Sequence, residues 1–215
     1  MTKMSQTKNE PVDTRLRDRE YRKFEFEIRA AKLGETEDNE ALYVEGYAVR
    51  FNEVTVLYEY DNIQYKEKVA PTALSEVDMT DVIFNYNHGG KVMARTRNKT
   101  LELKVDSKGL FIRARLDGTE EGRKLYEEIK GGYIDRMSFS FSTKESSYDS
   151  ENRTRTILRI KRLYDVSAVD IPAYDTTSIS ARNYFEAQEE ALNREKEERE
   201  EADKRRKRLL LETYL

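Results

Sequence analysis

The sequence of 215 residues contains no cysteine and a single histidine. Without cysteine the chain has neither a disulfide framework nor a thiolate nucleophile, and one histidine argues against a structural zinc site. No apolar run approaches the roughly 20 residues that a membrane-spanning helix requires. Residues 1–8 also lack the apolar core of a secretion signal. We therefore expect a soluble protein of a reducing cytoplasm.

The chain also lacks an excess of charge of one sign. Its 39 basic and 42 acidic residues give a net charge of −3, which is no reason to expect a general nucleic-acid binder. Hydrophobic residues make up 37% and charged residues 38%. This apolar share is low for a compact protein, so we expect part of the chain to lie outside the core. The length suits one domain with extensions.

Composition divides the chain into three segments. Residues 1–20 are polar and without pattern, which predicts a disordered arm. Residues 21–182 carry the patterns of regular structure and form the predicted domain. Residues 183–215 are rich in Glu, Lys and Arg, which predicts an exposed helical tail without a sustained heptad repeat.

Alternating apolar and polar residues predict that the domain is mostly β with a few helices. Strands are expected at 24–28, 42–51, 65–69, 82–88, 100–105, 110–116, 134–142, 156–172 and 177–181. Helices are expected at 71–77, with Pro71 in the first turn, and at 119–130, capped by Thr119. The polar stretch 144–153 is expected to be a connection between two strands.

His88 is the candidate general base, because an imidazole titrates near neutral pH. It follows a β-rich run and precedes Gly89 and Gly90. This order predicts a strand that delivers the imidazole to a rim of the fold and breaks at the glycine pair. The alternative, that His88 is an ordinary surface or core residue, stays open at this point.

Ser138 is the candidate nucleophile. Alternation along 137–142 places the three serines on one face of a strand and Met137 with the two phenylalanines on the other. The alternative is a half-buried strand whose serines form a polar outer face.

Asp165 begins the most apolar run in the second half of the chain, 165–172. A buried carboxylate needs a partner, and an imidazole N–H is a suitable one. Two alternatives stay open: an ion pair with one of the nearby cations, and a rival acid at Asp170. The nearby cations are Arg159, Lys161 and Arg162.

Four segments occur in a fixed order: Gly-Tyr-Ala-Val-Arg-Phe at 46–51, Asn-His-Gly-Gly at 87–90, Arg-Met-Ser-Phe-Ser-Phe at 136–141, and Asp-Val-Ser-Ala-Val at 165–169 followed by Pro-Ala-Tyr at 172–174. Together they resemble the prohead (capsid maturation) serine proteases of tailed bacteriophages. The resemblance covers about 20–182. It implies an α+β fold similar to that of the herpesvirus assembly proteases, with a closed or partly open antiparallel β-barrel.

The resemblance also implies a serine endopeptidase with Ser138 as nucleophile, His88 as base and Asp165 as third member. Asp170, or no acid at all, remains an alternative for that third position. No metal or cofactor is expected. The implied substrates are a scaffold protein or the scaffolding segment of the major capsid protein, and the protease itself, inside the immature capsid in the host cytoplasm. The implied partners are these substrates and a second copy of the chain in a homodimer, without nucleic acid or membrane.

Two departures from the family pattern bear on the site. Ser140 stands where the family often has glycine, which leaves open which serine attacks. Ala94-Arg95 stands where the family tends to have Gly-Arg, which alters a turn near His88. The herpesvirus proteases use a second histidine as third member, and this chain has none.

Two other functions remain open. A catalytically inactive, scaffold-like capsid assembly protein would keep the fold and lose the chemistry. A β-rich binding module would use the charged tail to hold a partner.

Overall fold

The computed structural model describes residues 19–33, 41–170 and 174–213, which are mostly β-structure with two helices. The predicted disordered arm lies outside the described residues except for its last two positions. In chain order the elements are β1 (Glu20–Leu33), β2 (Ala41–Arg50), β3 (Thr55–Tyr60), β4 (Ile63–Val69), β5 (Ile83–Tyr86), β6 (Gly89–Arg95), β7 (Leu101–Val105), β8 (Gly109–Arg115), α1 (Glu120–Lys130), β9 (Arg136–Asp149), β10 (Thr154–Val169) and α2 (Tyr174–Thr213).

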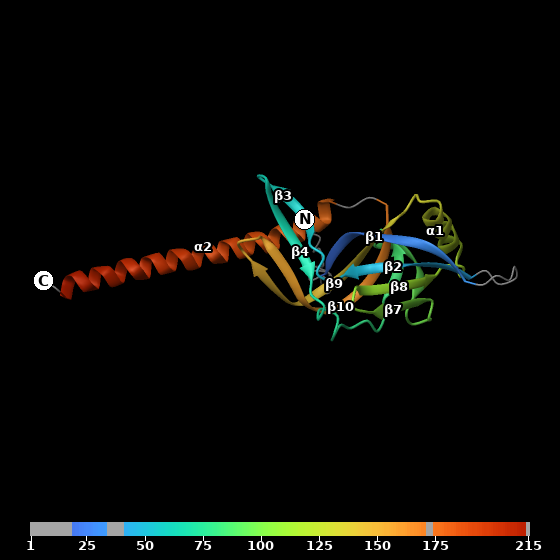
Figure 1. Ribbon diagram of the computed structural model, residues 1–215, viewed down its shortest axis with the longest axis horizontal. Coiled ribbons are helices and arrows are strands. Elements are labelled where there is room, and N and C mark those ends of the chain that lie inside the picture. Colours follow the sequence, from blue (N-terminus) through green and yellow to red (C-terminus); the bar gives the residue numbers. More distant parts are fainter. Residues whose placement is uncertain (1–18, 34–40, 171–173, 214–215) are drawn as a thin grey trace, which may run out of the picture.

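The strands pair along one path, in the order β3-β4-β10-β9-β1-β2-β8-β7. Strand β5 pairs with β10 on the same edge as β4 but further along the strand, at 165–168 instead of 154–157. Its other edge pairs with β6. Within the described residues no pairing joins the two ends of the path, so the sheet is open; of the closed or partly open barrel that was expected, the closed form is not present. Figure 1 shows the strands wrapping around a common interior with α1 at one end of the body.

Strand β10 is the centre of this arrangement. It runs antiparallel to β9 and parallel to both β4 and β5. Residues 165–169 of β10 are all buried, as expected for a strand with neighbours on both edges and covered faces. This position explains the apolar run that begins at Asp165.

Strand β1 is divided between two partners. Its first half, from Glu20 to Phe24, pairs with β9, and its second half, from Ile28 to Leu33, pairs with β2. The register with β9 is irregular between Phe24 and Glu27, so the two halves are held by separate sets of hydrogen bonds.

The predicted helix at 119–130 is confirmed as α1. The Thr119 side chain accepts a hydrogen bond from the Gly122 backbone N–H, and two glutamates lie in the first turn, where the helix dipole favours negative charge. Leu125, Tyr126 and Ile129 form its buried face and join the apolar core, which also includes residues of β2, β8, β9 and β10.

Helix α2 is longer than expected and begins earlier. Residues 177–181, predicted as a strand, lie inside it, so that prediction was wrong. Phe185 is 1% exposed and packs among the rings of Tyr58, Tyr65 and Tyr148, which anchors the helix to β3, β4 and β9. Anchoring by a tertiary aromatic cluster is not visible in local sequence periodicity.

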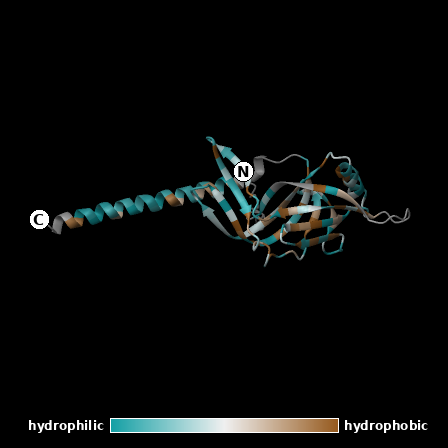
Figure 2. Ribbon diagram, viewed as in Figure 1, coloured by the Kyte–Doolittle hydropathy of each residue, from teal (hydrophilic) through white to brown (hydrophobic). Residues whose placement is uncertain are grey.

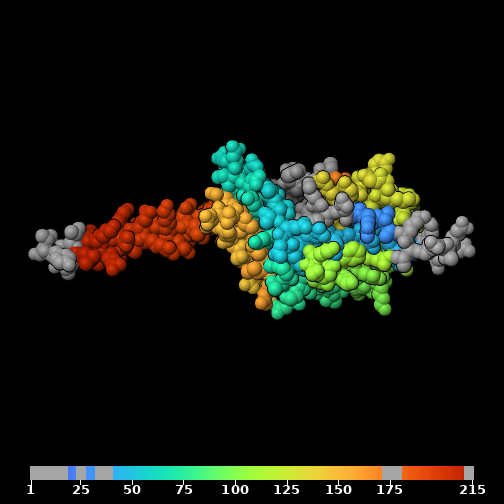
Figure 3. Space-filling model, in the orientation of Figure 1, coloured from blue at the N-terminus to red at the C-terminus, as the bar shows by residue number. Residues whose placement is uncertain are grey.

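The rest of α2 extends away from the body, and residues 190–210 are exposed (Figure 1, Figure 3). Figure 2 shows that this part is mainly hydrophilic, as its Glu, Lys and Arg content predicted. Neither helix among the described residues combines the length and the apolar character needed to cross a membrane.

Other local predictions were also wrong. Residues 71–76 form turns instead of a helix, because the Ala73 carbonyl accepts a hydrogen bond from Ile160 N–H in β10 and is lost to helical pairing. The stretch 144–153 is mostly an extension of the β9–β10 hairpin, closed by a turn in which the Asp149 carboxylate accepts backbone N–H groups. Strands β3 and β6 were not expected.

Candidate active site

His88 lies in a two-residue hairpin turn between β5 and β6. Tyr86 pairs with Gly89 across the turn, and the two central residues, Asn87 and His88, both have left-handed backbones with φ of 49° and 58°. This geometry is typical of a type I′ turn, whose twist matches that of the strands. The turn carries the histidine, but Gly89 and Gly90 begin β6, so the prediction that the structure breaks at the glycine pair was wrong.

Strand register brings the serines and Asp165 together. Ser138 on β9 is opposite Ser167 on β10, and Ser140 is opposite Asp165. Directly opposed residues of neighbouring strands point to the same face. On the other edge of β10, Ser167 is beside Asn85 of β5, three residues before His88. The turn therefore carries the imidazole over the same face of the sheet.

The three candidate residues are in mutual contact. Nε2 of His88 lies 2.6 Å from Oγ of Ser138, and Nδ1 of His88 lies 2.6 Å from Oδ1 of Asp165. The side chain of His88 is 11% exposed, and Ser138 and Asp165 are fully buried. The imidazole thus lies between the hydroxyl and the carboxylate, which is the geometry that general-base activation of a serine requires.

Ser167 also belongs to this group, and the sequence analysis missed it. Its Oγ lies 3.1 Å from Nδ1 of His88 and donates to Oδ1 of Asp165 at 3.0 Å or to Oδ1 of Asn85. The available signal was strand alternation, because Ser167 follows Asp165 by two residues and must share its face. The Ser167 hydroxyl thus hydrogen-bonds to Oδ1 of Asp165, the carboxylate oxygen that faces the imidazole.

The second oxygen of Asp165 has partners of its own. Oδ2 accepts hydrogen bonds from Oγ of Ser140 at 2.5 Å and from the guanidinium of Arg19. Burial by itself raises the pKa of Asp165, but the hydrogen bond and charge of His88, the Ser140 hydroxyl and the Arg19 charge outweigh burial and lower it. The carboxylate is therefore held in its ionised form.

Two of the three cations offered as alternative partners of Asp165 are engaged elsewhere. Arg159 pairs with Glu76 and Glu145, and Arg162 pairs with Asp78. The rival acid Asp170 accepts hydrogen bonds from Tyr86 and Asn87 on the exposed side of the turn. The contact that orients the His88 ring is therefore made by Asp165.

The serine face of β9 is not an outer face. Ser138, Ser140 and Ser142 are as buried as the apolar residues between them, so the alternative of a half-buried strand with a polar outer face was wrong. Beside Ser138 in the sheet lies the first half of β1: Lys23 is its direct partner, and the Arg22 carbonyl accepts a hydrogen bond from Ser138 Oγ at 2.8 Å.

The position of Ser138 allows two hydrogen arrangements, because one hydroxyl hydrogen faces two acceptors. With a neutral imidazole that donates from Nδ1 to Asp165, Nε2 accepts from Oγ, which is the arrangement for proton removal. With a doubly protonated imidazole, Nε2 donates to Oγ and Oγ donates to the Arg22 carbonyl. Both arrangements satisfy the geometry of the site.

Within the described residues no group of three or more His, Cys, Asp or Glu side chains is arranged to hold a metal ion. The side chains that face Ser138 are an imidazole, hydroxyls and a carboxylate, which together supply proton transfer and orientation.

Comparison with known proteins was informative at the level of the family. A family model described as caudovirus prohead serine protease matches residues 25–191. The solved structure of the bacteriophage T4 capsid assembly protease is 15% identical, with a TM-score of 0.44 over 72% of this chain and 99% of that chain. No curated protein matches the sequence.

Proposed function

We propose that this chain, which belongs to the caudovirus prohead serine protease family, uses Ser138 as nucleophile, His88 as general base and Asp165 as the acid that orients the base. The observation that carries the assignment is the position of His88, with one ring nitrogen 2.6 Å from Ser138 Oγ and the other 2.6 Å from Asp165 Oδ1. Because this family consists of serine proteases, the chain is a hydrolase of peptide bonds.

In the proposed mechanism Nε2 of His88 takes the Ser138 hydroxyl proton as Oγ attacks the carbonyl carbon of a peptide bond. His88 then gives the proton to the leaving amine, and an acyl-enzyme remains on Ser138. Water, deprotonated by His88, releases the acid product and restores the hydroxyl. Asp165 holds the hydrogen at Nδ1 and stabilises the imidazolium that forms in each step.

Ser140 takes a different role in this proposal. Its hydroxyl donates to Asp165 Oδ2. It therefore serves the acid, and Ser138 is the serine that faces the base. In this proposal the serine at position 140, where the family often has glycine, is not the nucleophile.

The substrates we propose are the scaffold protein or the scaffolding segment of the major capsid protein, with the protease itself as a further substrate. The proposed place of action is the immature capsid in the host cytoplasm. A homodimer is part of the same proposal, as is a likeness in fold to the herpesvirus assembly proteases. The support for these points is the family to which the chain belongs.

Mass spectrometry of the capsid precursor, incubated with the purified chain, tests the proposal. Ser138→Ala should lower the cleavage rate by about three orders of magnitude or more, because the nucleophile is lost. Ser140→Ala should keep measurable cleavage at the same bonds. A serine-directed fluorophosphonate should add its mass to the peptide that contains Ser138. Undiminished cleavage by Ser138→Ala would contradict the assignment, and no cleavage by any form of the chain would favour an inactive assembly protein.

A further inference from the structure

Helix α2 presents a long surface that the body of the protein leaves uncovered. Every residue from 190 to 210 is exposed, and this part of the helix runs away from the body (Figure 1, Figure 3). The charges are not mixed evenly along it. Residues 186–203 contain nine acids and three bases, whereas the basic block, residues 204–208, is five consecutive bases. The helix is therefore negative beside the body and positive towards its end.

Ion pairs within the helix account for only part of this order. Pairs four residues apart stabilise a solvated helix, as Glu195 and Arg199 do here. The basic block, however, places five positive charges within about one and a half turns, where they repel each other. Blocks of like charge of this length are common in segments that bind a partner. The basic block therefore favours an acidic partner surface.

The acids nearest the body share one face of α2 with two lysines of the basic block. Glu186 and Lys204 are five whole turns apart at 3.6 residues per turn. Glu189, Glu190 and Lys207 lie within about 60° of the same line. We call the three glutamates the acidic face. Because acids and lysines share one line, this surface of α2 carries both charges needed to bind a copy of itself.

An antiparallel pair of such helices matches the opposite charges. A step of three residues along one helix is then matched by a step of three back along the other. One register therefore places Glu186 beside Lys207 of a second copy. The same register places Glu189 beside Lys204 of that copy, and twofold symmetry repeats both contacts.

A cavity of about 290 Å³ adjoins the acidic face, between β3, β4 and α2. Tyrosine rings attract cations over their faces, and the Tyr58 ring already holds one, because Cζ of Arg182 lies 5.4 Å from its centroid. Tyr60 is 65% exposed, so its ring is accessible to a second cation. The residues that line this tyrosine cavity are Tyr58, Tyr60, Tyr65, Arg182, Glu186 and Glu189.

The tyrosine cavity also carries negative charge. Glu189 accepts a hydrogen bond from the Tyr65 hydroxyl at 3.0 Å, which fixes its carboxylate at the wall. Burial raises the pKa of Tyr58, and Tyr65, Glu189 and Glu186 raise it further, because negative charge nearby disfavours a phenolate. The same charges favour an ammonium group that enters the cavity.

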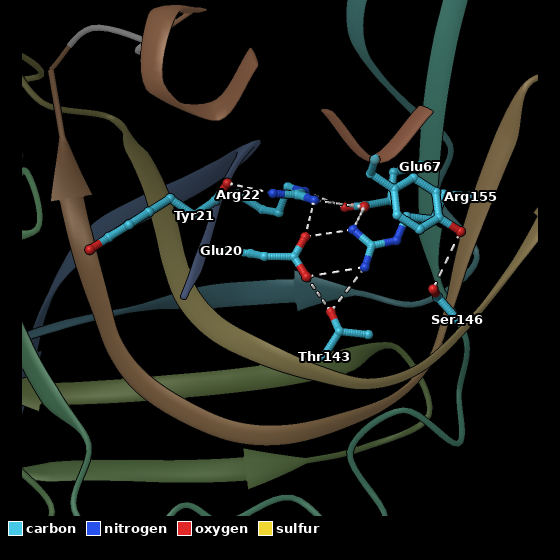
Figure 4. Close-up of polar contacts among 8 residues, drawn as sticks. Glu20, Tyr21, Arg22, Glu67, Thr143, Ser146 and Arg155 are labelled. Atoms are coloured by element: carbon cyan, nitrogen blue, oxygen red, sulfur yellow. Dashed lines mark hydrogen bonds and ion pairs between the residues drawn. The ribbon is translucent and has the colours of Figure 1, made fainter. Parts of the chain in front are cut away.

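The body holds the start of α2 in place. The Tyr184 hydroxyl lies 3.4 Å from Ser146 Oγ, and the Tyr184 ring centroid lies 4.2 Å from Cζ of Arg155. Figure 4 shows that Arg155 is held in turn by ion pairs with Glu20 and Glu67, at 2.5 and 3.2 Å. Because this end of α2 is already ordered, little conformational entropy is lost there when a second helix binds.

We propose that two copies of the chain pair through antiparallel α2 helices, with the basic block of each copy against the acidic face and the tyrosine cavity of the other. The partner is thus a second copy of this chain, and Lys207 is the side chain that reaches the cavity. This inference rests on the homodimer named in the proposed function and assigns its interface to α2.

Salt dependence is the first test. Exposed ion pairs are individually weak and are screened by salt, so the dimer should depend on both protein and salt concentration. Sedimentation velocity of the full chain should show a monomer–dimer equilibrium. Its Kd should rise about tenfold or more between about 50 mM and about 500 mM salt. A Kd that salt leaves unchanged would contradict pairing by charge.

Two charge-reversed variants test the interface itself. Lys204→Glu/Lys207→Glu reverses the basic block, and Glu186→Lys/Glu190→Lys reverses the acidic face while Glu189 is kept. Each variant alone should dimerise with a Kd raised about tenfold or more, because like charges then face each other. An equimolar mixture should form a heterodimer with a Kd within about threefold of wild type, because opposite charges again meet at both contacts.

Arg199→Glu/Arg206→Glu is the matched control. It makes the same change of charge in the same helix, on the side away from the line through Glu186 and Lys204. Its Kd should stay within about threefold of wild type, because at about 0.1 M salt the Debye length of about 10 Å is no greater than the width of a helix. Circular dichroism checks that α2 stays helical in each variant.

Single exchanges replace the double variants if either of those loses helicity. Lys207→Glu and Glu186→Lys carry the same expectations, because the two residues face each other in the proposed register. Each alone should weaken the dimer by about threefold or more, and their mixture should recover it.

The outcomes separate this inference from the proposed function. A dimer whose Kd neither reversal alters, or a mixture of folded variants that stays monomeric, would overturn the α2 interface while the protease assignment stands. A wild-type chain that is monomeric at every concentration would overturn the inference and the homodimer together. Cleavage of the capsid precursor is measured separately and decides the catalytic assignment in each case.

Discussion

Nδ1 of His88 lies 2.6 Å from Oδ1 of Asp165, although 77 residues separate them in the chain. The pairing depends on β5 and β10 lying side by side and on a turn that carries the histidine back over β10. This contact indicates that Asp165, and not Asp170, is the acid that orients the imidazole of His88.

Asp165→Asn should lower kcat by about 10³–10⁴-fold with little change in KM, because the amide no longer holds the hydrogen at Nδ1 or stabilises the imidazolium. Asp170→Asn is the matched control, since Asp170 contacts Tyr86 and Asn87. Its kcat should stay within about threefold of wild type. Steady-state kinetics on the capsid precursor checks both, and a large loss in Asp170→Asn alone would make Asp170 the third member.

Ser167→Ala should reduce kcat by about three- to tenfold while KM stays constant, because the Ser167 hydroxyl supports the Asp165 oxygen that faces His88. A positioning role should also move the pH at which kcat/KM reaches half its maximum, since the partners of the imidazole change. Ser167→Thr, which keeps a hydroxyl, should recover part of the rate. An unaltered pH profile together with a lower melting temperature would indicate a purely structural role.

Glu20 should make stability depend on pH in an acid window. Burial by itself raises the pKa of Glu20, but its hydrogen bond to Arg155 and the charges of Arg22 and Arg155 lower it from 4.5 to about 2. A lowered folded-state pKa contributes stability above the unfolded value of 4.5, and this contribution is lost as pH falls from 4.5 towards 2. A shift of this size corresponds to roughly 3 kcal/mol.

Urea unfolding of wild type and Glu20→Gln at pH 7, 4.5 and 3 measures this contribution. The advantage of wild type in free energy of unfolding should be constant between pH 7 and 4.5 and smaller at pH 3. Other acids titrate in both proteins and cancel in the difference. An advantage that stays the same at pH 3 would contradict the prediction.

Phe185→Ala should destabilise the chain by about 3–5 kcal/mol, because a fully buried aromatic ring leaves a cavity among the tyrosines that hold α2 to the sheet. Leu192→Ala, seven residues further along α2 and 42% exposed, is the matched control and should change stability by less than about 0.5 kcal/mol. Thermal melts followed by circular dichroism compare the two. Equal melting temperatures would mean that α2 does not depend on the Phe185 contact.

Local elements whose signals are contained within a few residues could be predicted from the amino-acid sequence. Alternation identified most of the strands, and Thr119 with the acidic first turn identified α1. The candidate residues His88, Ser138 and Asp165 followed from chemistry and from family resemblance: one histidine, a serine in a strand, and an acid opening an apolar run. Each of these signals lies within one segment.

The contacts between those segments depend on the three-dimensional fold and could not be predicted from any one segment. The turn at 71–76 depends on a hydrogen bond to β10, and α2 is held by the contact of Phe185 with tyrosines of β3, β4 and β9; such distant contacts override local propensity. The same holds for Ser167 beside His88 and for Arg22 over Ser138. Strand register places these side chains together, and register is a relation between segments that neither segment encodes alone.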